Sequence, residues 1–198
     1  MVSGILRRKR SGLNFGRRKK KVNMGIVKEV AGWIFEIVVT ILIAFTCVYF
    51  AGLRTSVVGQ SMEGTLSSGD EILVNRFLYK VTDPKPNDLV VFLPNGNEKS
   101  HYYVKRVIAV PGDTVLIKNG AVYVNGELFQ EEAEVASIEE AGLAAEEITL
   151  EDDEYFVLGD NRNNSEDSRY ANIGNVKKEY MIGKAWFRIA PLGKFGFL

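Results

Sequence analysis

Two residues of this sequence, Ser61 and Lys105, could act as a nucleophile and its general base. Ser61 stands in VVGQSMEGTL at 57–66, a segment too irregular for a helix. A serine hydroxyl becomes an effective nucleophile when a neighbouring base removes its proton. Lys105 stands in the largely apolar segment YVKRVIAVPGD at 103–113, where burial would lower the pKa of its amine and let it accept that proton. Such a pair would support attack on a carbonyl group and formation of an acyl-enzyme.

Both residues also have an ordinary structural explanation. Serines in Gly-rich segments usually turn or cap the backbone, and a lysine in a strand is usually exposed. His101 is the only histidine and is a second possible base for Ser61. Residues 101 and 105 point to the same face of a strand, so spacing alone does not choose between them. The adjacent Arg106 is expected on the opposite face, in solvent.

A third polar segment, GDNRNNSEDSRY at 159–170, directly follows an apolar strand and is expected to form a loop. Its residue types suit the support of a catalytic pair. Ser165 could hydrogen-bond an amine and orient it, and Asp167 and Arg169 could form a bidentate ion pair that fixes the loop.

The N-terminal part predicts a membrane anchor. Residues 1–28 carry ten of the 25 Lys and Arg residues and none of the 25 acidic ones, so the remainder has a net charge of −10. Basic runs can bind nucleic acid, but the apolar run at 30–53 is long enough to cross a bilayer. Because basic residues precede this run, the N-terminus is expected inside the cell. We predict a cytoplasmic tail over 1–28, a single transmembrane helix over 29–53, and no nucleic-acid partner.

A cleaved signal peptide is the alternative for the same region. The apolar run exceeds the roughly 7–15 residues of a signal-peptide core, and no A-x-A sequence closes it, which favours a retained anchor in the cell membrane. The lone cysteine, Cys47, lies within the predicted span, so the outer domain has no disulfide to form. No residue cluster has metal-ligand spacing, and no Gly-rich phosphate loop occurs. We therefore expect neither a metal nor a cofactor.

Residues 54–198 are predicted to form an extracytoplasmic domain that is mainly β, with curled antiparallel sheets. Short apolar runs alternate with turn signals throughout this part. Asn119-Gly120 and Asn125-Gly126 each predict a tight hairpin, because a type I′ turn needs two residues with positive φ. The acidic, Ala-rich segment at 131–154 is expected to be a partly helical or mobile insertion whose charges face solvent.

Five segments, in this order, resemble the motifs of bacterial type I signal peptidases, which are membrane-bound serine proteases with a Ser/Lys dyad. The five segments are GQSMEGTL at 59–66, GDEILVNRF at 69–77, DLVVF at 88–92, YVKRVIAVPGD at 103–113 and GDNRNNSEDSR at 159–169. The predicted single span with the N-terminus inside is similar to the Gram-positive type. Five ordered motifs are more specific than any one of them.

The resemblance implies a role for each matching residue. Ser61 matches the nucleophile and Lys105 the general base, whereas His101 has no counterpart in the motifs. Four further positions match residues that surround the pair in the family: Met62, Ser165, Asp167 and Arg169. Of these, Ser165 matches the serine that orients the lysine. The implied activity is removal of signal peptides from exported preproteins with small residues at positions −1 and −3, at the outer membrane surface.

The sequence departs from the family pattern at three positions. Gly64 stands where proline is usual, so the segment after the nucleophile is expected to be looser. Gly59 stands where some relatives have a hydroxyl that joins the oxyanion hole, which leaves backbone donors, the N–H of Ser61 among them, or water to stabilise the oxyanion. Asn163 replaces an acidic residue.

Two other functions remain open on the sequence. The same anchor and β domain could belong to a non-catalytic binding or scaffold protein, in which Ser61 is a turn residue and Lys105 is exposed. Self-cleaving repressor-type proteases also use a Ser/Lys pair, but a transmembrane anchor and a basic inner tail argue against them.

Overall fold

The computed structural model describes residues 24–198, and the side chains of these residues other than 47–51. The chain divides into two compact units, Met1–Ala44 and Phe45–Leu198. Residues 1–23 of the predicted basic tail therefore lie outside the described residues. The side chain of Cys47 also lies outside them.

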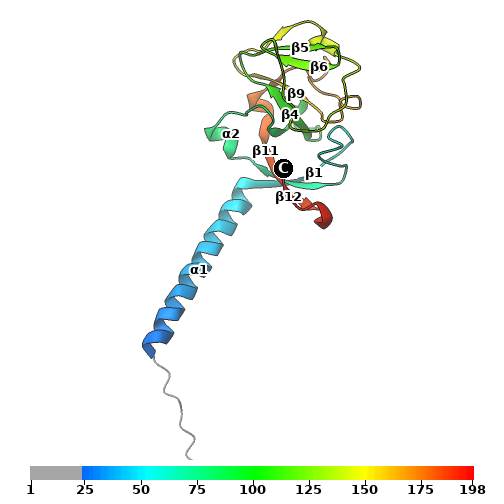
Figure 1. Cartoon of the computed structure of the whole chain (residues 1–198). Helices are drawn as coiled ribbons and strands as arrows, with labels where there is room; N and C mark the ends of the chain where they lie inside the picture. Colours follow the sequence, from blue (N-terminus) through cyan, green and yellow to red (C-terminus); the bar gives the residue numbers. More distant parts are fainter. Residues whose placement is uncertain (1–23) are drawn as a thin grey trace, which may run out of the picture. The chain divides into compact units, whose positions relative to one another are not determined.

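The long helix α1 spans Met24–Ala51 (Figure 1). Its described apolar side chains are largely exposed, among them Trp33, Phe35 and Phe45. Across the described residues, no helix combines the length and the hydropathy needed to cross a membrane. The transmembrane helix predicted over 29–53 is therefore not confirmed.

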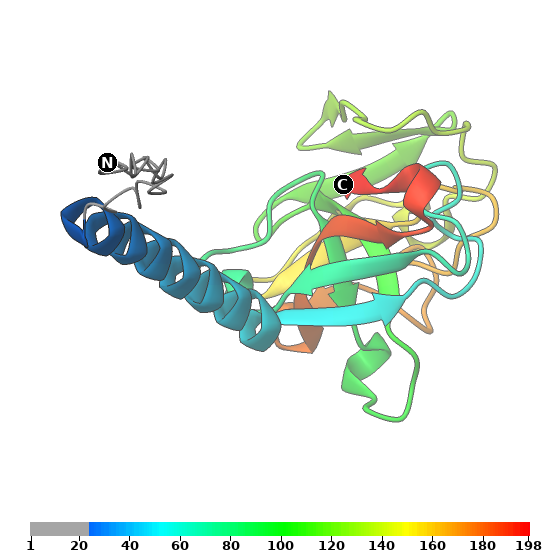
Figure 2. The same cartoon turned by 90° about the horizontal axis from the view of Figure 1, so that it is seen from below.

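The second unit is mainly β, as predicted, and its larger sheet is antiparallel with eight strands. Seven of them lie in the order β1 (Gly52–Ser56), β2 (Glu71–Asn75), β11 (Met181–Ala190), β3 (Leu89–Phe92), β4 (Tyr103–Ala109), β9 (Glu154–Leu158) and β10 (Val176–Lys177). The eighth, β12 (Gly196–Phe197), pairs with β11. Figure 2 shows β1, β2 and β11 side by side.

A smaller antiparallel sheet has four strands in the order β7 (Glu127–Leu128), β6 (Ala121–Val124), β5 (Thr114–Lys118) and β8 (Ile148–Thr149). Figure 1 shows β5 and β6 at one end of the β domain and β1 and β12 at the other. Both predicted hairpins are confirmed, because Asn119-Gly120 joins β5 to β6 and Asn125-Gly126 joins β6 to β7. All four turn residues have positive φ, with 53° at each asparagine.

Only short helices accompany the two sheets in the described part of the β domain. They are α2 (Leu78–Val81) and the 3₁₀ turns η1 (Pro94–Gly96), η2 (Gly142–Ala145), η3 (Lys178–Tyr180) and η4 (Leu192–Lys194).

The acidic insertion, residues 131–154, differs from its prediction. It contains no α-helix, only η2, β8, irregular chain and, at Glu154, the first residue of β9. It packs onto the β domain through Ile138, Ala144 and Leu150, which are buried in one apolar cluster. These three residues are six apart, a spacing that places them on no single helical face. Burial of widely spaced anchors thus overrides the helix propensity of the alanines and glutamates between them.

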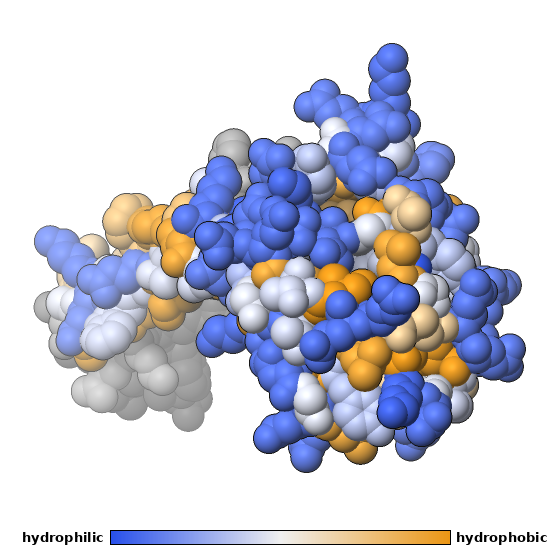
Figure 3. All heavy atoms as spheres, turned by 90° about the horizontal axis from the view of Figure 1, so that it is seen from above, coloured by the Kyte–Doolittle hydropathy of each residue, from blue (hydrophilic) through white to orange (hydrophobic). Residues whose placement is uncertain are grey.

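The interior of the larger sheet determines where the site can form. All four residues of β3 are buried, and in β4 every residue after Tyr103 is buried. A strand covered on both faces reads as a continuous apolar run, so a charged residue within it is removed from water. Figure 3 shows one face of the molecule, on which apolar patches lie between hydrophilic residues.

Candidate active site

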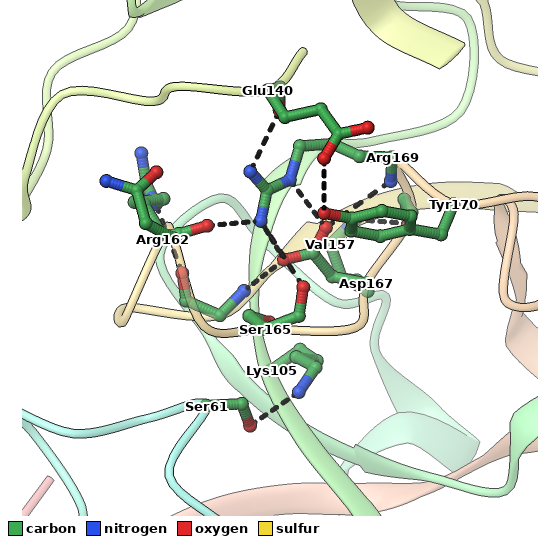
Figure 4. A network of polar contacts seen from close by, with 12 residues as sticks. Ser61, Lys105, Glu140, Val157, Arg162, Ser165, Asp167, Arg169 and Tyr170 are labelled. Carbon is green, nitrogen blue, oxygen red and sulfur yellow. Dashed lines mark hydrogen bonds and ion pairs between the residues drawn. The ribbon is translucent and has the colours of Figure 1, made fainter. Parts of the chain in front are cut away.

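Ser61 and Lys105 come into direct contact although 44 residues separate them. The Nζ atom of Lys105 lies 2.6 Å from the Oγ atom of Ser61 (Figure 4). Lys105 is fixed by the central strand β4 and is 2% exposed. The Ser61 carbonyl accepts a hydrogen bond of 3.0 Å from the backbone N–H of Asn161, so the loop after β9 holds the serine in place.

The environment of Lys105 suits a general base. Burial lowers the pKa of its ammonium group to about 8, against the opposing effect of the Asp167 and Glu166 carboxylates, which favour the charged form. About a tenth of the Lys105 side chains are therefore neutral at pH 7, and about half are neutral near pH 8. A neutral amine in contact with a serine hydroxyl can accept its proton.

His101 does not take this position. It is exposed, and within residues 24–198 no hydrogen bond joins its ring to Ser61. Both His101 and Lys105 line the same cleft, but only Lys105 contacts the hydroxyl. The geometry thus decides between two residues that strand parity could not separate.

Arg106 was expected in solvent, and this prediction is wrong. Its side chain is buried and forms two hydrogen bonds with the Asp160 carboxylate, of 2.8 Å from Nε and 2.7 Å from Nη2. Asp160 also accepts a 2.5 Å hydrogen bond from the hydroxyl of Thr65. The ion pair therefore connects β4, the segment after Ser61 and the loop after β9. Sequence reasoning missed it because both faces of β4 are covered.

Asp167 and Arg169 form the expected bidentate ion pair. Arg169 donates to the two carboxylate oxygens of Asp167 over 2.8 and 2.9 Å, and neither residue is more than 1% exposed. Asp167 also accepts a 3.1 Å hydrogen bond from the backbone N–H of Gly159. The pair closes the loop on itself next to the strand that precedes it.

Ser165 lies in the cleft with Ser61 and Lys105, but it does not hydrogen-bond to the lysine. Its hydroxyl is buried and has no hydrogen-bond partner among the described residues. The residue packs against Gly159, where an added Cβ would lie 2.2 Å from the Ser165 hydroxyl and 2.4 Å from the Ser61 carbonyl oxygen. Gly159 was not singled out from the sequence, although a glycine at the end of an apolar strand is a signal of such close approach.

Met62 and Gly64 shape the backbone around the nucleophile. Met62 is 1% exposed and packs in an apolar cluster with Val57 and Leu66, so it anchors the segment and does not reach the reacting atoms. Gly64 has a φ of +102°, which proline, with φ fixed near −65°, cannot adopt. Glycine at position 64 is therefore matched to the backbone conformation of this chain.

The cleft around Ser61 has a volume of about 560 Å³. Its walls come from residues 58–61, residues 101–105, and residues 163–166 together with Tyr170 and Asn172. Within residues 24–198, no group of three or more His, Cys, Asp or Glu side chains is placed to hold a metal ion. What the cleft offers a substrate is the Ser61 hydroxyl, the Lys105 amine and strand backbone.

Residues 30–190 match the family described as signal peptidase, peptidase S26. The chain belongs to this family. It is 36% identical over 157 residues to a protein of Synechocystis sp. named probable signal peptidase I-2, covering 74% of this chain and 70% of that one. It is 34% identical over 187 residues to signal peptidase I P of Bacillus subtilis subsp. natto, covering 91% and 97%.

A crystal structure of a signal peptidase I from Enterococcus faecalis is 28% identical and covers 52% of this chain and 97% of that one, with a TM-score of 0.41. Because that score is low, the family assignment rests on the sequence matches. These confirm the family that the five motifs indicated. The chain is accordingly a serine endopeptidase of the signal peptidase type.

Proposed function

We propose that this protein removes N-terminal signal peptides from exported preproteins, with Ser61 as the nucleophile and Lys105 as the general base. The observation that carries the proposal is the 2.6 Å contact between the Ser61 hydroxyl and a buried lysine whose pKa is about 8. Family membership supplies the reaction class, and the geometry supports the assignment of Ser61 and Lys105 to it.

The reaction follows from the two groups in contact. Neutral Lys105 takes the hydroxyl proton as Ser61 Oγ attacks the carbonyl carbon of the scissile peptide bond, and the protonated lysine then gives that proton to the leaving amine. The signal peptide remains bound to Ser61 as an ester until water, deprotonated by Lys105, hydrolyses it. A well-placed general base accounts for roughly 10²–10⁴ of the rate enhancement.

The negative charge that develops on the substrate oxygen needs a hydrogen-bond donor. Gly59 has no side chain to offer, but the backbone N–H of Ser61 donates to no backbone acceptor within the described residues. In this proposal that N–H points to the oxyanion and stabilises it during attack.

An extended substrate fits beside β4. Strand β3 pairs with β4 from Tyr103 to Arg106, whereas β9 pairs with it only from Arg106 onwards. The first residues of β4 line the cleft, and among residues 24–198 no strand pairs with one of their two edges. In this proposal the substrate peptide adds there as a further strand. Alternate residues of such a peptide face the same wall, so we assign positions −1 and −3 to that wall and propose small residues there.

A location at the outer surface of the cell membrane belongs to the same proposal. It is supported by the basic run before residue 28 and by the apolar run at 30–53. Fractionation of cells that express the chain, followed by protease treatment of intact cells, tests both the location and the orientation. Recovery of the protein in the soluble fraction would contradict the proposal.

The activity is tested with a preprotein that carries an Ala-X-Ala cleavage site, in detergent or lipid. The unchanged protein should cut at this site, while Ser61→Ala and Lys105→Ala should abolish cleavage and His101→Ala should retain most of it. Normal cleavage by Ser61→Ala would refute the assignment of the nucleophile. Loss of activity in His101→Ala with activity retained in Lys105→Ala would make this a Ser/His enzyme.

A further inference from the structure

The acidic insertion contacts the loop at 159–170, which carries Ser165 and Asp167. Three sets of contacts join the two stretches, and the first is a bidentate ion pair between Glu131 and Arg162. The Arg162 guanidinium donates to the two Glu131 carboxylate oxygens over 2.6 and 2.8 Å. The Arg162 side chain is 2% exposed and that of Glu131 is 20% exposed, so the insertion supplies the charge that compensates a buried cation.

Arg162 is tied to the loop at both its side chain and its backbone. Its Nε donates to the Gly159 carbonyl over 3.1 Å, and its own carbonyl accepts a 2.6 Å hydrogen bond from Arg169 (Figure 4). Removal of the Glu131 charge would leave a buried guanidinium without a compensating carboxylate. The guanidinium would then have to move toward water, and its bonds to the loop would move with it.

The second set of contacts uses Asn163. Its Nδ2 donates to the Ser137 carbonyl over 3.0 Å, and its Oδ1 accepts a 3.0 Å hydrogen bond from the Glu139 N–H. A side chain that both donates and accepts is needed here, and a carboxylate could do only the second. The asparagine at this position is thus matched to the insertion.

The third set involves Tyr170, whose hydroxyl donates to the Glu140 carboxylate over 3.3 Å, and Arg169. The Nη1 atom of Arg169 donates to the Glu140 carbonyl over 3.1 Å, and its own carbonyl accepts a 2.8 Å hydrogen bond from the Leu143 N–H. Figure 4 shows Glu140 above Arg169, on the side of the network away from Ser61 and Lys105. The insertion therefore holds the loop from its outer side, whereas the reacting groups lie on its inner side.

A displacement of the loop at 159–170 would also displace Ser61, because the two are in direct contact. The Asn161 N–H holds the Ser61 carbonyl, and Gly159 packs without spare room between that carbonyl and the Ser165 hydroxyl. Arg162 donates a hydrogen bond to the Gly159 carbonyl. Glu131 is therefore connected to Ser61 through two intervening residues, Arg162 and Gly159.

We propose that Glu131 is a positioning residue for the Ser61–Lys105 pair, and that the acidic insertion is a brace for the loop at 159–170. The inference rests on the proposed function for its effect on catalysis, but the brace itself can be tested without activity. A misplacement of about 1 Å at a reacting group can lower the rate about 100-fold, so the expected effect falls on kcat and not on KM.

The experiment compares Glu131→Gln, Glu131→Asp and the control Glu134→Gln, an exposed glutamate of the same insertion. Hydrogen exchange of the Gly159 and Asn161 amides is measured in the full chain, together with kcat and KM on the Ala-X-Ala preprotein. Glu131→Gln should accelerate exchange at both amides at least tenfold and lower kcat at least tenfold, with KM within twofold. Glu131→Asp should restore most of the slow amide exchange and most of kcat. The control Glu134→Gln should match the protein without substitutions in both.

Unchanged exchange in a folded Glu131→Gln protein would overturn the brace. Faster exchange with unchanged kcat would overturn the positioning role. If the protein without substitutions does not cleave the preprotein, the proposed function is refuted. The brace is still tested in that case, because hydrogen exchange does not depend on activity. If Glu131→Gln does not fold, Asn163→Asp replaces it. This variant keeps the acceptor for the Glu139 N–H, loses the bond to Ser137 and places a carboxylate oxygen against the Ser137 carbonyl, so its loop amides should again exchange faster than in the control.

Discussion

The pH dependence of cleavage tests the assignment of Lys105 most directly. Only the neutral amine can accept the Ser61 proton, and the pKa of Lys105 is lowered by burial to about 8. Each pH unit below the pKa lowers the neutral fraction about tenfold. We therefore expect kcat/KM to lie about tenfold below its plateau at pH 7 and about 100-fold below it at pH 6.

A single substitution should move this profile in a known direction. The Glu166 carboxylate raises the pKa of Lys105, so Glu166→Gln should lower that pKa and shift the rising limb to lower pH. Glu127→Gln, in the smaller sheet, serves as the control and should leave the limb in place. The assay is kcat/KM from initial rates at half-unit steps between pH 5.5 and about 9.5, with folding checked at each pH.

Two results would refute the reasoning. A rising limb with its midpoint near 6.5 that disappears in His101→Ala would indicate a histidine base. A limb that moves to higher pH in Glu166→Gln would mean that the titrating group is not a cation near this carboxylate.

The buried lysine also predicts how stability depends on pH. Its folded pKa lies below the unfolded value of 10.5, so the folded state releases the proton first and stability should rise with pH between about 8 and 10.5. The expected rise in the free energy of unfolding is about 3 kcal/mol. Lys105→Met should abolish it, which urea unfolding at several pH values would measure. Gly64→Pro should lower the free energy of unfolding by about 1–3 kcal/mol because proline cannot adopt positive φ, whereas Gly64→Asn should cost less. Arg106→Met should cost about 3–5 kcal/mol, since it leaves Asp160 buried and unpaired; a loss below about 1 kcal/mol would contradict the structural role of that ion pair.

Local signals in the sequence were enough for the strands and the turns. Asn119-Gly120 and Asn125-Gly126 specify turns through backbone sterics within two residues, and both hairpins form. The apolar runs of β3 and β4 likewise identify buried strands. Such features need no knowledge of what packs against them, which is why sequence alone predicts them.

Features that depend on distant partners were harder to predict. Arg106 seemed free because alternation assigns one face of a strand to water, yet β4 is covered on both faces and Asp160 arrives from a loop 54 residues away. The acidic insertion has the composition of a helix, but its conformation follows from three anchors that enter the core. In both cases tertiary contacts override the local preference.

The two adjacent cations of β4 explain how one strand can hold both a structural charge and a base. Arg106 and Lys105 are both buried, but Arg106 has the Asp160 carboxylate as a bidentate partner and so keeps its charge. The nearby Asp167 carboxylate is already paired with Arg169, and within residues 24–198 no carboxylate lies at ion-pair distance from Lys105. Its hydrogen-bond partner is instead the hydroxyl of Ser61. Desolvation without a paired carboxylate lowers the pKa of a lysine, and the arginines that pair with Asp160 and Asp167 add to this effect of burial because they occupy two carboxylates near Lys105.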